Sequence, residues 1–178
     1  MNFDNNSIEP LITIHPFSLE SLFWPNNITL FNANSLVWPT ANLAMFFPFM
    51  VNKRITAVKM FAMNGATLSG AIDVGIYDVS GTRLISSGST GQVGVSNLQI
   101  FDIVDTSFGP GTFYLAVTMN NIIGRLMAGE DAIARTLSSV GILQMTAAFP
   151  LPAVATFATV TEPNNRIPWF GLSTRIIL

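Results

Sequence analysis

Apolar and polar positions alternate along two segments of the chain, residues 71–77 and 112–119. A period of two is typical of a β-strand that turns one face toward a core, because successive side chains of a strand point to opposite sides. In the first segment the opposite face is mixed and includes Asp73 and Tyr77. The positions that we expect to face the core are Ile72, Val74, Ile76, Leu115 and Val117.

Turn signals separate these segments from further apolar runs. Residues 78–81 begin with Asp and end with Gly, and residues 109–111 read Gly-Pro-Gly, so both stretches have the composition of tight turns. The predicted strands of this block lie at residues 54–64, 71–77, 82–86, 98–104 and 112–119. No helical pattern lies between them, and closely spaced strands of this kind pair in antiparallel order. The expected fold class is therefore all-β: an antiparallel, jelly-roll-like β-sandwich.

The pattern is weaker after residue 119. Residues 129–137 predict one or two helical turns or a long loop. Further strands are expected at residues 142–147, 153–161 and 166–178. The last of these ends in Ile-Ile-Leu, and an apolar end of this kind is normally tied into a sheet or an interface.

The first 42 residues differ from the rest of the chain. They are rich in Asn and contain Pro10, Pro16, Pro25 and Pro39. Proline removes a donor from a strand ladder and biases the preceding residue toward extended conformations. The sequence therefore predicts an extended N-terminal arm at residues 1–42 and a β-sandwich domain at residues 43–178. The apolar side chains of such an arm need another surface to pack on.

A short repeat lies within this arm. Ser-Leu-Phe-Trp-Pro-Asn at residues 21–26 is echoed by Ser-Leu-Val-Trp-Pro-Thr at residues 35–40. Trp is enriched where one side of its ring is apolar and the other is polar. Two interpretations stay open: Trp anchors that pin the extended chain to the sandwich, or aromatic surfaces that bind sugar rings or insert into a neighbouring subunit. The candidate interface residues are Phe17, Phe23, Trp24, Phe31, Trp38 and Trp169.

The composition indicates a surface that is poor in charge. Charged residues make up 10% of the chain and hydrophobic residues 49%, whereas charged residues average about 25% of soluble domains. A lone monomer normally carries more charge for solubility, so we expect a homo-oligomer. The net charge of -2 gives no reason to expect nucleic acid or an anionic membrane as a partner.

No segment predicts export or membrane insertion. The longest apolar run, at residues 43–51, is interrupted by Pro48 and falls short of the ~20 residues of a membrane span. The first Lys or Arg is Lys53, so the basic start of a secretory signal is missing. We expect no membrane partner, and we expect the protein to be made and assembled in a cytoplasm.

Residue types that carry catalysis or bind metals are few. The chain contains no Cys, and His15 is its only histidine. Close carboxylates can serve glycoside hydrolysis or calcium binding, and the close pairs here are Asp73 with Asp78 and Asp102 with Asp105. Because Asp78 and Asp105 stand where turns favour Asp, we assign these pairs structural roles. We therefore expect no catalytic residues, no metal site, no cofactor and no enzymatic activity.

Short motifs spread over most of the chain after residue 54 carry a resemblance. They are AMNGAT at residues 62–67, IDVGIYD at 72–78, GTRL at 81–84, SGST at 87–90, PGTFYLA at 110–116, FPLPA at 149–153 and FGL at 170–172. Together they resemble a recurring sandwich in structural proteins of tailed bacteriophages. Such proteins occur as capsid decoration (cement) proteins, head fibres and tail components, and none of these roles implies catalytic residues.

The resemblance implies a virion structural protein, and the expected role is capsid decoration by adhesion between subunits. The implied partners are copies of the chain itself, expected as a trimer because jelly-roll virion proteins often close three-fold rings, and the major capsid protein or another virion protein. The implied location is the virion, after assembly in the host cytoplasm. The alternative is a tail or fibre sandwich that binds a host receptor or glycan. A capsid role predicts that the three Trp are buried in subunit contacts, whereas a glycan role predicts at least one exposed Trp face beside Asn and Asp side chains.

Overall fold

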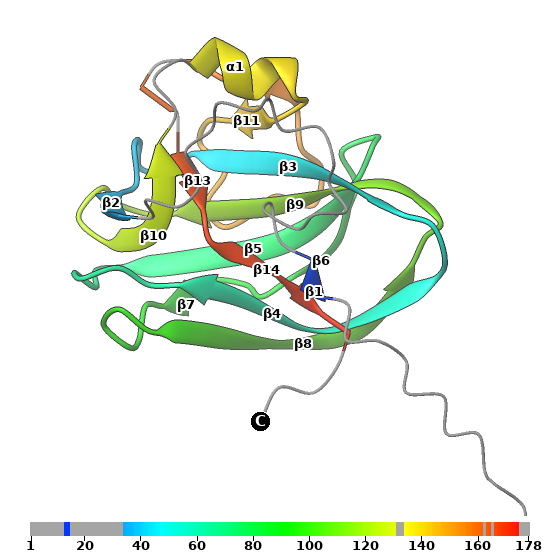
Figure 1. The fold of residues 1–178 in the computed structure, drawn as a ribbon, viewed down its shortest axis with the longest axis horizontal. Coiled ribbons are helices and arrows are strands. Elements are labelled where there is room, and N and C mark those ends of the chain that lie inside the picture. The colour runs from blue at the N-terminus through cyan, green and yellow to red at the C-terminus, as the bar shows by residue number, and fades with distance from the viewer. Residues whose placement is uncertain (1–12, 15–33, 131–133, 162, 165, 175–178) are drawn as a thin grey trace, which may run out of the picture.

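The fold is an all-β, antiparallel β-sandwich, as the alternation predicts. A computed structural model describes residues 13–14, 34–130, 134–161, 163–164 and 166–174 of the chain (Figure 1). Within these residues strands dominate, and the one helix, α1 (Ala134–Ser139), is short. Every strand pairing among them is antiparallel.

Two large sheets form the layers of the sandwich, and a small sheet lies at one end (Figure 1). The four-stranded sheet contains, in order, β1 (Thr13–Ile14), β14 (Phe170–Ser173), β4 (Ile55–Met63) and β8 (Leu98–Phe108). The seven-stranded sheet contains, in order, β12 (Ala158–Thr159), β11 (Leu143–Met145), β3 (Ala44–Val51), β9 (Gly111–Met119), β5 (Ala71–Asp78) and β6 (Arg83–Ser86), with β7 (Thr90–Gly91) also paired to β5. The three-stranded sheet contains, in order, β13 (Arg166–Pro168), β10 (Arg125–Glu130) and β2 (Asn34–Val37).

The long strands alternate between the two layers along the chain. β3 lies in the seven-stranded sheet, β4 in the four-stranded sheet and β5 in the seven-stranded sheet again, and β8 and β9 repeat the alternation. This order is jelly-roll-like, since jelly rolls are built from two such sheets. The predicted turn after β5 is present: Asp78 Oδ1 accepts hydrogen bonds from the N–H groups of Ser80 and Thr82, each at 2.9 Å. Gly81 closes the turn with a φ of 88°, a conformation that favours glycine.

The core lies between the inward faces of the two large sheets. The positions predicted in β5 and β9 are at most 1% exposed, which confirms the face assigned from the alternation: Ile72, Val74, Ile76, Leu115 and Val117. Side chains of the four-stranded sheet complete the same cluster, and they include Met60, Phe101, Phe170 and Leu172.

The other face of the seven-stranded sheet is buried as well, because residues 148–157 cover it. Phe46 and Tyr77 lie on this face with ring centroids 5.2 Å apart, and Leu151 packs in the same cluster. Strand β5 therefore has buried side chains on both sides. This arrangement explains why its mixed face carries a tyrosine and the fully buried Asp73.

Asp73 fastens the covering segment to β5. Its Oδ2 accepts a hydrogen bond from the N–H of Leu151 at 3.0 Å, and its Oδ1 accepts one from the hydroxyl of Ser87 at 3.2 Å. Burial raises the pKa of Asp73 above its ordinary value of 3.8, while these hydrogen bonds act in the opposite direction. The hydroxyl of Tyr77 adds a further bond, to the carbonyl of Pro152 at 2.5 Å.

Residues 153–161 do not form the single strand that their alternation predicts. Only β12 is regular, and it has two residues. The stretch before it bonds to the far side of the β5–β6 hairpin: the N–H of Arg83 donates to the carbonyl of Ala153 at 2.9 Å, and the N–H of Ala155 donates to the carbonyl of Gly81 at 2.8 Å. These two bonds form an isolated antiparallel bridge between Thr82 and Val154, which stands in place of a strand ladder.

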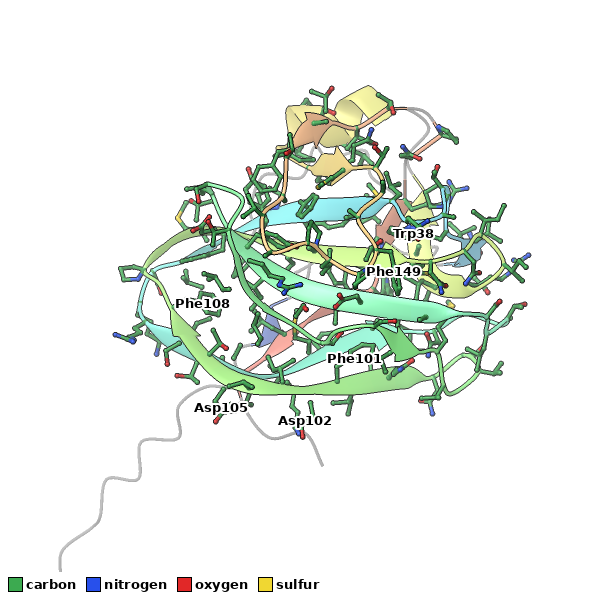
Figure 2. The ribbon with its side chains drawn as sticks, turned by 180° about the vertical axis from the view of Figure 1, so that it is seen from behind. Trp38, Phe101, Asp102, Asp105, Phe108 and Phe149 are labelled. Carbon is green, nitrogen blue, oxygen red and sulfur yellow. The ribbon has the colours of Figure 1, made fainter. Side chains whose placement is uncertain are left out.

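Three other expectations also need correction. The helix begins at Ala134, later than predicted, because β10 extends to Glu130. The last predicted strand is divided at Trp169, where the chain leaves the three-stranded sheet as β13 and enters the four-stranded sheet as β14. Asp105 lies inside β8 and not in a turn, and Figure 2 shows it pointing away from the sandwich.

Of the predicted arm, the structure describes residues 13–14 and 34–42. β1 pairs with β14, and β2 pairs with β10. Trp38, which follows β2, is 2% exposed and belongs to the core cluster. The described part of the arm is therefore joined to the chain's own sheets.

Candidate interaction surface

Apolar side chains lie on the outer face of the four-stranded sheet, the side turned away from the core. The strand register pairs Met63 of β4 with Leu98 of β8, and two positions along it pairs Phe61 with Ile100. Directly paired residues project to the same side of a sheet. Leu98 is 42% and Ile100 38% exposed, and the other two are partly buried. We call these four residues the outer face.

The sequence of β8 produces this surface by alternation. Phe101 is 3% exposed and points into the sandwich, whereas Asp102 points away from it (Figure 2). Because Phe101 takes an inward position, Leu98 and Ile100 share the outward side with Asp102. A charged residue in the same alternating set indicates that this side meets solvent.

An ion pair borders the apolar residues. Lys59 Nζ lies 2.7 Å from Asp102 Oδ1, and the strand register pairs the two residues. The hydrogen bond and the positive charge of Lys59 lower the pKa of Asp102 below its ordinary value. The Asp102 side chain is 84% exposed, so solvent screens the pair and it adds little to stability. The outer face is thus apolar with a charged pair at one end, and apolar residues next to polar ones are common in protein interfaces.

Trp169 adjoins the outer face beside Met63. Its carbonyl accepts a hydrogen bond from the N–H of Met63, and its own N–H donates to the carbonyl of Met127, each at 2.8 Å. These two bonds hold its backbone where the three-stranded sheet meets the four-stranded sheet. The side chain is 43% exposed, so this candidate interface residue lies at the surface.

Trp38 lies in the core instead. It is 2% exposed, and its Nε1 donates a hydrogen bond to the carbonyl of Leu43 at 2.9 Å. In the same copy of the repeat, the Ser35 hydroxyl accepts a hydrogen bond from the N–H of Ala66 at 2.6 Å. This copy therefore anchors the chain to its own sandwich. The candidates that lie outside the described residues are Phe17, Phe23, Trp24 and Phe31.

Asp73 and Asp78 make structural hydrogen bonds. Asp73 binds the covering segment, and Asp78 Oδ1 accepts the hydroxyl of Ser80 at 2.6 Å, which lowers the pKa of Asp78. Among the described residues, no three His, Cys, Asp or Glu side chains are grouped so that they could hold a metal ion. The described helix is also too short and polar to cross a membrane.

The outer face was not identified from the sequence, although a signal for it exists. Residues 98–104 are apolar at five positions that fall on both faces of the strand, so the pattern does not say which side is the core. Asp102 shares its parity with Leu98 and Ile100, and that parity marks the solvent side.

Comparison with protein-family models, curated proteins and solved structures gave no match for this chain.

Proposed function

We propose that this protein is a structural component of a tailed-bacteriophage virion and decorates the capsid by adhesion. Its partners are copies of itself, expected as a trimer, and the major capsid protein or another virion protein. It is assembled in the host cytoplasm and remains in the virion. The motif resemblance supports the phage assignment. The observation that carries the adhesive role is the outer face with the neighbouring, exposed Trp169.

The outer face suits adhesion because its backbone is already ordered. Its side chains project from paired strands, so binding orders little additional chain and loses little entropy. Interfaces draw most of their energy from a few well-packed residues, among which Trp is enriched. Trp169 fits that description, and Leu98 and Ile100 add apolar area beside it.

A tail or fibre protein that binds a host receptor or glycan is the second candidate. The exposed indole of Trp169 favours it, because Trp presents a large apolar ring with a polar edge. Met63 is its hydrogen-bonded neighbour on β4, and the register places Leu98 on the far side of Met63. Leu98 has no atom that can hydrogen-bond to sugar hydroxyls and the thioether of Met63 is only a weak acceptor, so a protein surface has the stronger support.

Binding of full-length protein to purified particles that lack it tests the proposal. We expect Ile100→Asp and Trp169→Ala to weaken binding at least roughly tenfold, which corresponds to about 1.4 kcal/mol. Val79→Asp is the matched control, since Val79 is 62% exposed in the turn after β5, in the other layer. Circular dichroism checks that each variant is folded.

Unchanged binding by both outer-face variants would refute adhesion through this surface. Specific binding to a purified host glycan that Trp169→Ala abolishes, without any binding to particles, would favour the receptor-binding role.

A further inference from the structure

Three loops meet at the end of the sandwich next to β2 and β10 (Figure 1). They are residues 65–70 between β4 and β5, residues 92–97 between β7 and β8, and residues 120–124 between β9 and β10. Each loop joins strands of different sheets, so the topology itself brings them together. We call these three loops the loop end.

The tips of two of these loops are apolar and exposed. Val93 is 62% and Val95 59% exposed in one loop, and Ile122 is 54% and Ile123 62% exposed in the other. Apolar side chains scattered singly over a surface need no explanation, but several at one place mark an interaction site.

Buried amide side chains hold the loop at residues 92–97 in place. Asn64 is fully buried, and its Nδ2 donates to the carbonyl of Val93 at 2.7 Å. Gln99 Oε1 accepts the N–H of Val93 at 3.0 Å and Asn64 Nδ2 at 2.9 Å. Gln92 completes the network by donating from Nε2 to Asn64 Oδ1 at 2.9 Å. Both backbone groups of Val93 are thus bound by buried side chains, which rigidifies the loop.

The second exposed loop is held by its own asparagine. Asn121 Oδ1 accepts the N–H groups of Ile123 and Gly124, each at 2.8 Å. This is an Asx-type turn, in which a side chain replaces a backbone acceptor. Asn121 Nδ2 also donates to the carbonyl of Ser69 at 2.9 Å. A Cβ on Gly124 would lie 2.6 Å from that same carbonyl oxygen, so only glycine allows the two loops to approach this closely.

The composition of the loop end indicates its partner. Its three loops contain no charged and no aromatic residue. Membrane-binding segments use Lys or Arg toward anionic headgroups and Trp or Tyr at the interface, and the loop end has none of these residues. By contrast, homodimer interfaces are more apolar than others, and an uncharged surface meets no repulsion from an identical one.

We propose that the loop end is a contact between copies of this chain. Val93, Val95, Ile122 and Ile123 of one copy pack against the loop end of the next around a rotation axis, as closed oligomers require. The proposal rests on the self-association within the proposed function and specifies the surface through which it occurs. The ordered loops reduce the entropy lost on association.

Cross-linking of single-cysteine variants tests which surfaces meet. The chain has no cysteine, so Val95→Cys and Ile123→Cys each introduce one exposed thiol into the full-length protein. Val79→Cys is the control, at the opposite end of β5. With a flexible bismaleimide at micromolar protein, we expect covalent dimers from both loop-end variants and few from the control. Equal dimer yields from all three variants, or none from the loop-end pair, would overturn the proposal.

Native mass spectrometry of Ile123→Asp measures the consequence. We expect an oligomer for the wild type and for Val79→Asp, and monomer for Ile123→Asp, with unchanged circular dichroism because the side chain is 62% exposed. Wild-type mass for Ile123→Asp would overturn the proposal. The proposal would also be overturned if Ile123→Asp kept the wild-type mass but lost binding to particles or to phosphatidylcholine vesicles. The loop end would then serve another partner. A wild-type oligomer that depends on Ile123 but ignores particles would refute capsid decoration and support the loop-end contact.

Discussion

Substitution of Asp73 separates the contribution of its hydrogen bonds from that of its charge. The side chain is 0% exposed, and its oxygens accept hydrogen bonds from Leu151 and Ser87. Asp73→Ala removes the acceptor of the Leu151 N–H. Leu151 is only 1% exposed, so water cannot replace that acceptor. An unpaired buried donor destabilises a fold by ~1–3 kcal/mol. We expect Asp73→Ala to lower the free energy of unfolding by that amount in urea denaturation at neutral pH.

Asp73→Asn isolates the charge. The amide oxygen can still accept the Leu151 N–H, but the side chain no longer ionises. Burial raises the folded-state pKa of Asp73, so its contribution to stability is complete below the ordinary pKa of 3.8 that the unfolded chain has. That contribution is lost as the pH rises through the folded pKa. The Asn variant should therefore gain stability relative to the wild type as the pH rises from about 4 to neutral.

Urea denaturation of both proteins at several pH values measures this difference. Other titrating groups contribute nearly equally to both proteins and cancel. If the Asn variant instead loses relative stability as the pH rises, the hydrogen bonds to Asp73 outweigh its burial and the reasoning is refuted.

Two other predictions concern the core and the arm. Ile76 is 0% exposed between the layers, so Ile76→Ala should lower the free energy of unfolding by ~2–5 kcal/mol in the same assay, and a change within error would mean that the inward face of β5 is misassigned. Removal of residues 1–33 retains β2 and Trp38 and should leave the circular dichroism of a β-sandwich. Removal of residues 1–42 also deletes Trp38 and should destabilise the fold by a further ~3–5 kcal/mol. Equal stability of the two truncated proteins would contradict the anchoring role of Trp38.

The elements that the sequence predicted well are those with one apolar face. In β5 and β9 the Ile, Val, Leu and Met residues share one parity, so the core face follows from the backbone geometry alone. Residues 153–161 also alternate, but the backbone partners of Ala153 and Ala155 are Arg83 and Gly81, far away in the chain. No local pattern encodes such a partner, so the expected strand was wrong.

The interaction surfaces were harder to predict for a related reason. The Trp-Pro motif around Trp38 is compatible with an anchor and with a binding surface, and the choice depends on the pairing of β2 with β10. The sequence did not predict the loop end as an interaction surface, because Val95 and Ile123 stand among Gly, Ser and Asn, which are typical of loops. The ordered position of the loop that carries Val95 depends on the buried amide of Asn64, which bonds to residues far away in the sequence.

The position of this chain in an assembled particle tests capsid decoration most directly, and a cryo-electron microscopy reconstruction of purified virions would measure it. We expect copies repeated over the capsid lattice, with Trp169 and Ile100 buried against a capsid subunit and the loop ends of neighbouring copies in contact. A chain that is absent from the particle, or confined to the tail with Trp169 facing solvent, would contradict capsid decoration.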